Sequence, residues 1–532
     1  MQTTSETSVL VVGGGAAGSI LSLELARRGV AARTVDRLAA PNTTSRAINV
    51  QPRTAELLEL VDRDLVRRYT DRAIHNKGYI LHFVRNGKRS EVRPGLDFTT
   101  VDCRYPYILI NGQADTEAFI NDYLRERYGR ETEWNKKLVD VTQDSDGITA
   151  TLIRGDDESD RELVRCRYLV ACDGMRSRVR ETLGLSQTGS DYRGTVLQNL
   201  DAFIEDFPDV EDYVHYCVGD DHFVMVVRMP AGYFRMLLSD RGNAADPDVT
   251  PQQAFQHLLD QHFDGARISD TVWHSKWESW VRLADTYRSG NIFLAGDSAH
   301  VHSTAGGQGM NCCMQDAFNL GWKLALVEKG LAGPELLDTY EAERRPIAEQ
   351  VIWAASALHE VFMGHGKDVG ERSERINDPD FLADIVGRCS GISYTYRDYV
   401  DQPTGLTPLD GPAIGDRAPD VDLEDGTVLF DLFRHPDFTL LAIGGDDDSG
   451  SLERISRRFR DRYSRVLSSH VLKQSQCVEK YYGRNEQGRL YLIRPDGYIG
   501  YRCLTAEADR LEEYLRTILV MKPGRVSTAI KE

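Results

Sequence analysis

Three short segments combine glycine with a carboxylate in spacings that suit a bound nucleotide. The first reads Gly13-Gly14-Gly15-Ala16-Ala17-Gly18 and is followed 18 residues later by Asp36. Glycines permit a tight turn and close approach to a pyrophosphate, the free N–H groups of a following helix attract the anion, and the later acid accepts hydrogen bonds from a ribose. The second segment contains Asp173-Gly174, and the third contains Gly296-Asp297 before a glycine-dense loop, residues 305–311. Together they predict a dinucleotide site.

The elements that must position the first segment occur in the required order. Residues 9–12 are a short apolar run typical of a buried parallel strand. The pattern predicts a helix from Ala16 to Arg28 and a second strand from Val30 to Val35. This order distinguishes the segment from an isolated glycine turn. Because Asp36 disfavours a 2′-phosphate, we expect FAD or NAD here rather than NADP.

Composition narrows the classes of partner. The chain has 532 residues, with 82 acidic and 64 basic side chains and a formal net charge of −18. This length predicts two to four domains, and this charge disfavours nucleic acid and anionic membranes as partners. The nine cysteines include no CxxC pair, which predicts reduced thiols and a cytoplasmic location. No segment has the pattern of a signal peptide or a transmembrane helix, and a homodimer is left open.

The three motifs carry a family resemblance. The chain resembles the class A flavin monooxygenases, the para-hydroxybenzoate hydroxylase and phenol hydroxylase family of single-component aromatic hydroxylases. The most specific part is the third motif, which continues from Gly306-Gly307-Gln308-Gly309-Met310-Asn311 into residues 315–324. The resemblance implies an α/β fold with a Rossmann-like FAD-binding domain of residues 1–180 and 286–400. It also implies an inserted, mostly β substrate domain of residues 181–285 and a thioredoxin-like α/β domain of residues 401–532.

The same resemblance implies roles for individual residues. The glycines of the first motif would lie on the FAD pyrophosphate, Asp36 on the adenosine ribose and Asp297 on the ribityl chain. Asp173 would reach FAD or the nicotinamide nucleotide, whereas Arg46 and Gln113 match positions that contact the flavin or its phosphates. The expected cofactor-binding residues are Gly13, Gly15, Ala16, Ala17, Gly18, Asp36, Arg37, Arg46, Gln113, Asp173, Asp297, Gly307, Gly309, Met310 and Asn311.

Candidate substrate residues come mostly from the predicted β domain. Tyr216 and Phe223 have the spacing that para-hydroxybenzoate hydroxylase uses for its substrate-phenol tyrosine and a following phenylalanine. The candidate catalytic residues are Tyr216, Arg235 and Asn49. The phenol hydroxylase branch carries an aspartate in the segment that matches residues 46–51, but here that segment holds no acid. Activation by a carboxylate from this place is therefore not expected. The tryptophans at positions 273, 277 and 280 are expected to pack in the fold.

The sequence departs from the patterns of related proteins at two further places where those patterns support chemistry. Ser303-Thr304 stands where many relatives have a Pro-Pro pair, and Gly444-Gly445 follows the first core strand of the last domain where a redox thioredoxin carries CxxC. Dithiol chemistry is therefore not expected there. His300 and His302 lack a third ligand nearby in sequence, so no metal site is predicted.

The resemblance implies a complete reaction. FAD is reduced by NADPH or NADH, reacts with O₂ to a flavin C4a-hydroperoxide, and passes one oxygen atom to a phenolic or polyketide-like aromatic ring. Two alternatives remain open at this point. The same cofactor chemistry could epoxidise a quinone or insert oxygen beside a carbonyl in a Baeyer–Villiger reaction. The chain could also be a flavin-binding partner protein without turnover.

Overall fold

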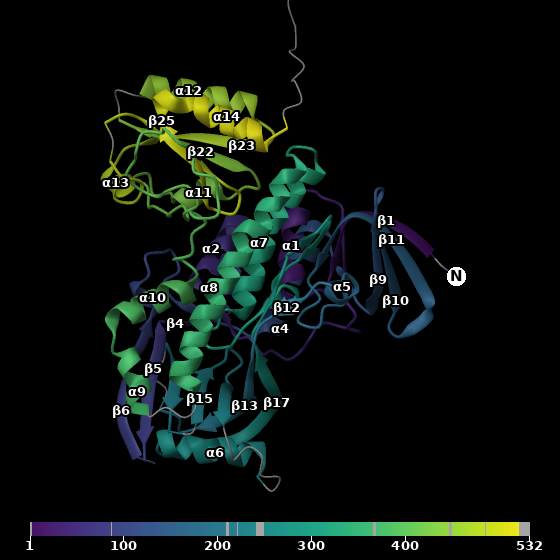
Figure 1. Cartoon of the computed structure of the whole chain (residues 1–532). Coiled ribbons are helices and arrows are strands. Elements are labelled where there is room, and N and C mark those ends of the chain that lie inside the picture. Colours follow the sequence, from purple (N-terminus) through teal and green to yellow (C-terminus); the bar gives the residue numbers. More distant parts are fainter. Residues whose placement is uncertain are drawn as a thin grey trace, which may run out of the picture. The chain divides into compact units, whose positions relative to one another are not determined.

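The computed structural model describes residues 3–86, 88–208, 212–220, 222–240, 249–364, 369–445, 449–484 and 486–520. The chain divides into two compact units. Figure 1 shows the helices and strands of the whole chain. The first unit comprises residues 1–26, 31–318 and 344–394, and the second comprises residues 27–30, 319–343 and 395–532.

A largely parallel sheet carries the first glycine motif. Strand β1 pairs in parallel with β2 on one side and with β11 on the other, and β11 pairs in parallel with β20. Residues 9–11 of β1 are fully buried, which explains their continuous apolar run. The sheet has eight strands: β1 (Thr3–Val12), β2 (Ala32–Val35), β8 (Thr132–Glu133), β9 (Lys136–Asp144), β10 (Gly147–Arg154), β11 (Asp157–Ala171), β19 (Arg288–Ser289) and β20 (Ile292–Leu294).

A second, seven-stranded sheet forms the β layer expected around residues 181–285. Its order is β17-β13-β16-β15-β14-β5-β6. Two of these strands, β5 and β6, come from residues 78–97, which the sequence-based boundaries place in the FAD-binding domain. The strands are β5 (Gly78–Arg85), β6 (Lys88–Asp97), β13 (Asp191–Glu205), β14 (Tyr213–Val218), β15 (His222–Arg228), β16 (Phe234–Asp240) and β17 (Arg267–Trp280).

This sheet is covered on both faces, which explains its long apolar stretches. Helix α6 (Pro251–His262) packs on one face through Phe255, Leu258 and Leu259, and lies at the bottom of Figure 1. The opposite face presents Tyr79, Tyr216 and Phe223 to a second buried cluster that includes residues of helix α8 (Asp338–Met363). Because side chains alternate along each strand, the two faces have separate residues and separate roles.

Helices and two short sheets complete the first unit, which holds α1 (Ala16–Arg27) except its last residue, the first half of α7 (Gly309–Glu328) and most of α8. Pro346 lies inside the long helix α8. The short sheets have the orders β12-β18-β21 and β3-β7-β4. These elements are β3 (Asn49–Val50), β4 (Ile74–Asn76), β7 (Ile108–Ile110), β12 (Gln187–Thr188), β18 (Arg282–Ala284), β21 (His300–Val301), α1 (Ala16–Arg27), α2 (Pro52–Val61), α3 (Arg63–Thr70), α4 (Gln113–Tyr128), α5 (Arg178–Thr182), α7 (Gly309–Glu328), α8 (Asp338–Met363), α9 (Val369–Ile376) and α10 (Pro379–Ser390).

The second unit contains a four-stranded sheet of order β23-β22-β24-β25 with helices beside it. Strand β22 runs parallel to β23 and antiparallel to β24, a thioredoxin-like arrangement. Residues 446–448 after β22 lie outside the described residues. A buried network joins Glu343 to Lys323 and Arg494 within this unit. Its elements are α11 (Leu429–Phe433), β22 (Phe438–Gly444), α12 (Ser449–Arg462), β23 (Leu467–Lys473), α13 (Gln476–Tyr482), β24 (Arg489–Ile493), β25 (Ile499–Leu504) and α14 (Ala508–Ile518).

Candidate active site

The first glycine motif forms a tight turn between β1 and α1. Gly13 has φ +109°, and a Cβ atom there would lie 2.1 Å from the carbonyl oxygen of Cys172. Only glycine fits this close approach. Asp36, at the end of β2, accepts hydrogen bonds from the N–H groups of Gly14 at 2.7 Å and Leu38 at 2.8 Å. The acid thus lies against the glycine turn, as a ribose-binding carboxylate must.

A cavity of about 580 Å³ opens beside this turn, within the first unit. Its volume lies in the range of small-molecule sites, about 300–1,000 Å³. It brings together residues predicted from the first and third motifs and from the β sheet, and Gly174 of the second motif also lies on its wall. The predicted residues on its wall are Gly15, Ala16, Ala17, Arg46, Asn49, Gln113, Tyr216, Arg235, Asp297, Gly307, Gly309 and Met310. The predicted residues that are not on its wall are Gly13, Gly18, Asp36, Arg37, Asp173 and Asn311.

Two of the residues outside the wall make hydrogen bonds that shape it. Asp173 Oδ2 accepts hydrogen bonds from the backbone of Arg178 and Val179, at the start of α5. Its Oδ1 atom is buried and has no hydrogen-bond partner among the described residues. Asn311 donates to the carbonyl oxygens of Asn49 and Gly307. It therefore ties β3 to the glycine-dense loop of the third motif.

Glu117 is a buried carboxyl on the cavity wall that sequence reasoning did not single out. It lies on α4, 6% exposed, and Oε1 accepts a hydrogen bond of 2.7 Å from Gln113. It also accepts a hydrogen bond from the backbone of Ala16, at the N-terminus of α1. Burial raises the pKa of Glu117 to about 7, and the nearby Asp36 adds to the rise. A group that exchanges its proton near neutral pH thus lies beside the helix terminus that suits a pyrophosphate.

The loop that carries Asp297 is held by a buried ionic network. Gly296 N–H donates to Asp316, and His300 Nε2 lies 2.7 Å from the same carboxylate oxygen. Arg344 Nε donates to the other oxygen at 2.7 Å. Burial opposes charge on His300, but Cys312 and Asp316 hold its pKa well above the ordinary value.

The potential ligand atoms of His300, Cys312 and Asp316 lie within 4.8 Å of one another. His300 is thus a buried member of a cluster whose other members, Cys312 and Asp316, follow it by 12 and 16 positions in the chain. The permanent charge of Arg344 already neutralises the carboxylate of Asp316. We interpret the network as an anchor for the loop, since it fixes the backbone next to Asp297.

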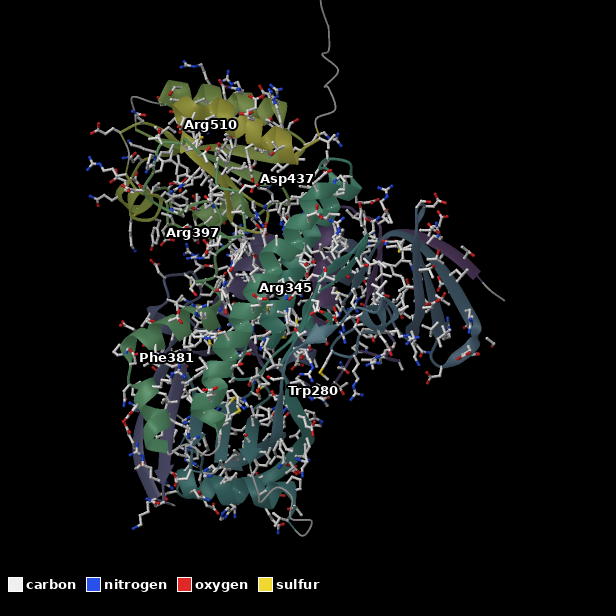
Figure 2. All side chains as sticks on the ribbon, in the orientation of Figure 1. Trp280, Arg345, Phe381, Arg397, Asp437 and Arg510 are labelled. Carbon is white, nitrogen blue, oxygen red and sulfur yellow. The ribbon has the colours of Figure 1, made fainter. Side chains whose placement is uncertain are left out.

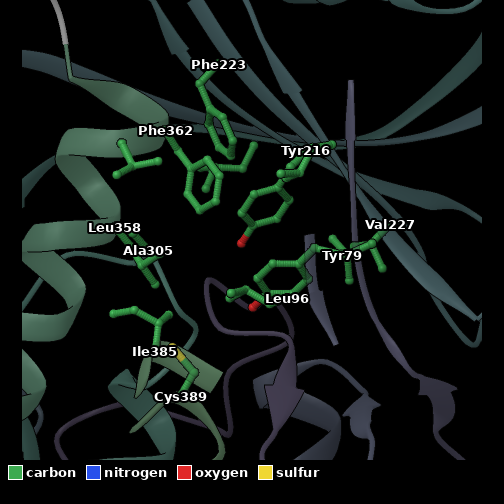
Figure 3. Close-up of a cluster of buried hydrophobic side chains, with 14 of the residues drawn as sticks. Tyr79, Leu96, Tyr216, Phe223, Val227, Ala305, Leu358, Phe362, Ile385 and Cys389 are labelled. Carbon is green, nitrogen blue, oxygen red and sulfur yellow. The ribbon is translucent and has the colours of Figure 1, made fainter. Parts of the chain in front are cut away.

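Two tyrosines form part of the aromatic wall. Tyr79 on β5 and Tyr216 on β14 stack with ring centroids 4.3 Å apart. Figure 3 shows both hydroxyl groups pointing to the same side, toward Ala305. Phe223 and Phe362 pack edge-on against Tyr216. Burial raises the pKa of both tyrosines above the ordinary value, so both hydroxyls are neutral hydrogen-bonding groups at physiological pH.

Arginine and tryptophan form another part of the wall. Arg235 makes a buried ion pair with Asp201 and lies 5.2 Å from the ring centre of Trp273. Arg46 lies 5.7 Å from the ring centre of Trp277. Both tryptophans line the cavity, as does Trp280, which Figure 2 labels. The sequence indicates packing for these tryptophans, and in the structure all three also line the cavity.

The cavity fits FAD. The N-terminus of α1 and the glycine loops offer N–H groups, and Asp297 is an exposed carboxylate on the wall. His302 Nε2 and Thr304 Oγ1 are buried atoms of wall residues and have no partner within the described part of the chain. Burial lowers the pKa of His302 to about 4, which leaves a neutral ring able to hydrogen-bond to a heterocycle. A nucleotide loop and an aromatic wall in one cavity define an oxidoreductase that brings a dinucleotide to a small organic molecule.

Comparison with known proteins gives the family. Residues 6–355 match the FAD binding domain model, and residues 411–520 match the model described as aromatic-ring hydroxylase, C-terminal. The chain is 37% identical over 533 residues to pentachlorophenol 4-monooxygenase of Sphingobium chlorophenolicum, covering 97% of both chains. It is 30% identical over 537 residues to the 12-dehydrotetracycline 5-monooxygenase/anhydrotetracycline 6-monooxygenase of Streptomyces rimosus, covering 96% of this chain and 98% of that protein.

Solved structures agree with this assignment. The anhydrotetracycline hydroxylase OxyS of Streptomyces rimosus superposes with a TM-score of 0.75 at 30% identity, covering 96% of this chain and 99% of that one. Aklavinone-11 hydroxylase in complex with FAD and aklavinone gives a TM-score of 0.75 at 25% identity, with the same coverage. The chain therefore belongs to the FAD-dependent aromatic-ring hydroxylases, and the predicted family, fold class, cofactor and monooxygenase activity are confirmed. No helix in the described part of the chain is long and apolar enough to cross a membrane.

Proposed function

We propose that this chain hydroxylates a phenolic ring, using NADPH or NADH and O₂, with the ring held between the tyrosine pair and the tryptophans of β17. One observation carries the proposal: the residues suited to the FAD pyrophosphate and those of the aromatic wall line a single cavity. The relatives named for pentachlorophenol and for tetracycline intermediates support a phenolic or polyketide-like substrate. Bound FAD supplies the redox chemistry, which is hydride acceptance and activation of O₂ for transfer of one oxygen atom.

The cavity residues would hold the cofactor as follows. The N-terminal turn of α1, with Gly15, Ala16 and Ala17, would bind the pyrophosphate, because its N–H groups and dipole favour an anion. Asp36 would bind the adenosine ribose, and Asp297 the ribityl chain. Arg46 and Gln113 would add contacts to the flavin or its phosphates. Gly13, Gly18, Arg37, Asp173 and Asn311 would act from outside the wall by shaping these loops.

The protein's own groups would orient the ring and exclude water. Tyr79 and Tyr216 offer neutral hydroxyls, and their aromatic faces favour a planar ligand. Arg235, held in place by its ion pair with Asp201, would offer a hydrogen-bonding guanidinium group to the substrate part of the cavity. Asn49 would support the glycine-dense loop, since a Cβ at Gly307 would lie 2.2 Å from the Asn49 amide nitrogen.

We also propose the domain limits of residues 1–180 and 286–400, 181–285, and 401–532, with β5 and β6 added to the substrate domain. All nine cysteines are free, which supports a cytoplasmic enzyme. A homodimer remains a proposal that solution scattering of the purified protein would test.

The decisive experiment mixes the purified flavoprotein with NADPH, or NADH, without oxygen and follows bleaching of the flavin absorbance. A panel of phenols, naphthoquinones and polycyclic aromatics is then added, one compound at a time. We expect a phenol to accelerate bleaching sharply, and the product formed under ¹⁸O₂ to gain one labelled oxygen on the ring. Product mass and connectivity separate hydroxylation from epoxidation or Baeyer–Villiger insertion. A product without label from O₂ would overturn the proposal, and absence of bleaching with either nucleotide would favour a non-catalytic flavoprotein.

A further inference from the structure

Asn199 is a buried amide with an unused donor on the cavity wall. It lies on β13 and is 2% exposed. Its Nδ2 atom has no hydrogen-bond partner among the residues that the structure describes. A buried donor without a partner costs about 1–3 kcal/mol and is rare in folded proteins. Such a group on the wall of a ligand cavity indicates that the ligand supplies the missing acceptor.

Two further groups with unused donors lie on the neighbouring strand. Trp277 Nε1 and Ser275 Oγ, both on β17, are buried atoms without a partner in the described part of the chain. Trp277 also lines the cavity. An indole N–H can only donate, and an amide nitrogen can only donate. The buried atoms without partners at this place are therefore mainly hydrogen-bond donors.

The strand register places these groups on one face of the sheet. Asn199 is paired with Ser275, and Leu197 is paired with Trp277 two positions along the same strands. Directly opposed residues have Cβ atoms about 4.5–5.5 Å apart, and residues two apart on a strand share a face. Leu237, the partner of Asn199 on β16, also lines the cavity. The strand pairing and the residues that line the cavity thus identify the same side of the sheet.

Two guanidinium groups line the cavity near these donors. Arg46 lies over the ring of Trp277 at 5.7 Å, and Arg235 lines the same cavity with Asp201 as its ion-pair partner. Glu278, the residue after Trp277 on β17, is an acidic residue that also lines the cavity. Hydrogen bonds to an ionised oxygen are shorter and about twice as strong as those to a neutral one.

We propose that Asn199 and Trp277, supported by Ser275, form the binding site for a ring oxygen of the substrate and select its ionised form. The inference rests on the proposed function and adds the group that activates the phenol. In this site the substrate O–H bond breaks, its proton passes to bulk solvent, and the phenolate oxygen accepts hydrogen bonds from the amide and the indole. Residues 46–51 contain no acid that could act as a base. In the proposed site, hydrogen-bond donors instead lower the pKa of the bound phenol and so favour its activated phenolate form.

The test uses the holoenzyme and 4-nitrophenol, whose ionised form has its own absorption band. The pKa of the bound probe is measured by spectrophotometric titration, with FAD-only spectra subtracted. We expect a bound pKa below that of the free probe in the wild type. Asn199→Ala and Trp277→Phe should each raise it by about one unit, which is a tenfold loss of preference for the phenolate. Asn199→Asp should exclude the phenolate, because two negative charges would meet.

Trp353→Phe is the matched control, since Trp353 is an exposed residue of α8 that does not line the cavity. The variant removes an indole without removing either proposed donor, and the bound pKa should stay as in the wild type. Flavin absorbance of each purified variant shows that the fold is intact. A wild-type bound pKa equal to that of the free probe overturns the inference. The inference is also overturned if Asn199→Ala and Trp277→Phe weaken binding of the phenol and phenolate forms of the probe equally. Neither result affects the ¹⁸O₂ test, so failure of this inference is distinguishable from failure of the proposed function.

Discussion

Replacing Glu117 by glutamine should stabilise the FAD-free protein above neutral pH and change little in acid. Burial raises the pKa of this carboxyl from 4.5 to about 7. Each pKa unit corresponds to about 1.36 kcal/mol, so the ionised carboxylate costs the folded state about 3 kcal/mol. The cost is absent below pH 4.5, grows between pH 4.5 and 7, and is complete above pH 7. Glutamine keeps the shape and an acceptor oxygen but has no proton to lose.

The assay is urea unfolding of the FAD-free wild type and Glu117→Gln, followed by tryptophan fluorescence at several pH values. The difference in free energy of unfolding should rise from near zero at the acid end to about 3 kcal/mol at pH 8. Glu126→Gln is the matched control, because Glu126 is an exposed residue of the same helix and its ion pair with Arg68 is on the surface. A surface pair of this kind contributes about 0–1 kcal/mol.

A difference between Glu117→Gln and the wild type that does not change with pH would refute the reasoning, since an uncharged packing effect has no proton dependence. A lower stability of the variant at pH 8 would refute it as well. The same variant should make FAD affinity less dependent on pH, because a phosphate beside Glu117 favours its protonated form. Fluorescence titration with FAD at pH 6 and pH 8 measures this.

Three further changes test other parts of the structure. Arg235→Leu leaves the buried Asp201 without its ion-pair partner, so we expect a loss of about 3–5 kcal/mol in urea unfolding, and an unchanged stability would contradict the pairing. Gly307→Ala places a side chain at φ +63° against Asn49, which should cost about 1–3 kcal/mol and weaken FAD binding measured by fluorescence quenching. Burial lowers the pKa of both His82 and His215, which lie 2.9 Å apart, to about 4. In the unfolded chain these rings take up protons below about pH 6.5, so between pH 6.5 and pH 5 each ring should lower the free energy of unfolding by about 2 kcal/mol. The His215→Phe variant should therefore lose about 2 kcal/mol less than the wild type over this range, as measured by urea unfolding.

The cofactor half of the site was predictable from sequence because its constraints are local. A strand, a glycine turn, a helix and an acid must follow one another closely, and each leaves a mark in residue type. Asp297 could be named because it belongs to one of the three motifs, and Arg46 and Gln113 because they match positions of the family that the chain resembles. The role of Glu117 was missed, since a lone glutamate inside a helix has no pattern, although its position four residues after Gln113 placed both on one helix face.

The substrate half depended on pairings that no local pattern reveals. Tyr79 meets Tyr216 only because β5 pairs with β14, more than a hundred positions away in the chain. Asn199 and Trp277 reach one face only through the register of β13 with β17, and a shift by one residue would turn them to the α6 side. The available signals were the spacing of Tyr216 and Phe223, which indicated a substrate tyrosine, and the repeated tryptophans of residues 273–280, which suggested packing.

The sequence by itself determined the cofactor class, the order of elements around the glycine turn, and the absence of a dithiol motif after β22. Each of these depends on residues close together in the chain, where chain geometry restricts the outcome. Only the tertiary structure decided which donors are left without partners, which carboxyl is buried enough to bind a proton at neutral pH, and which aromatic rings line the cavity. These properties arise from burial and long-range strand register, and both are set by how distant segments pack.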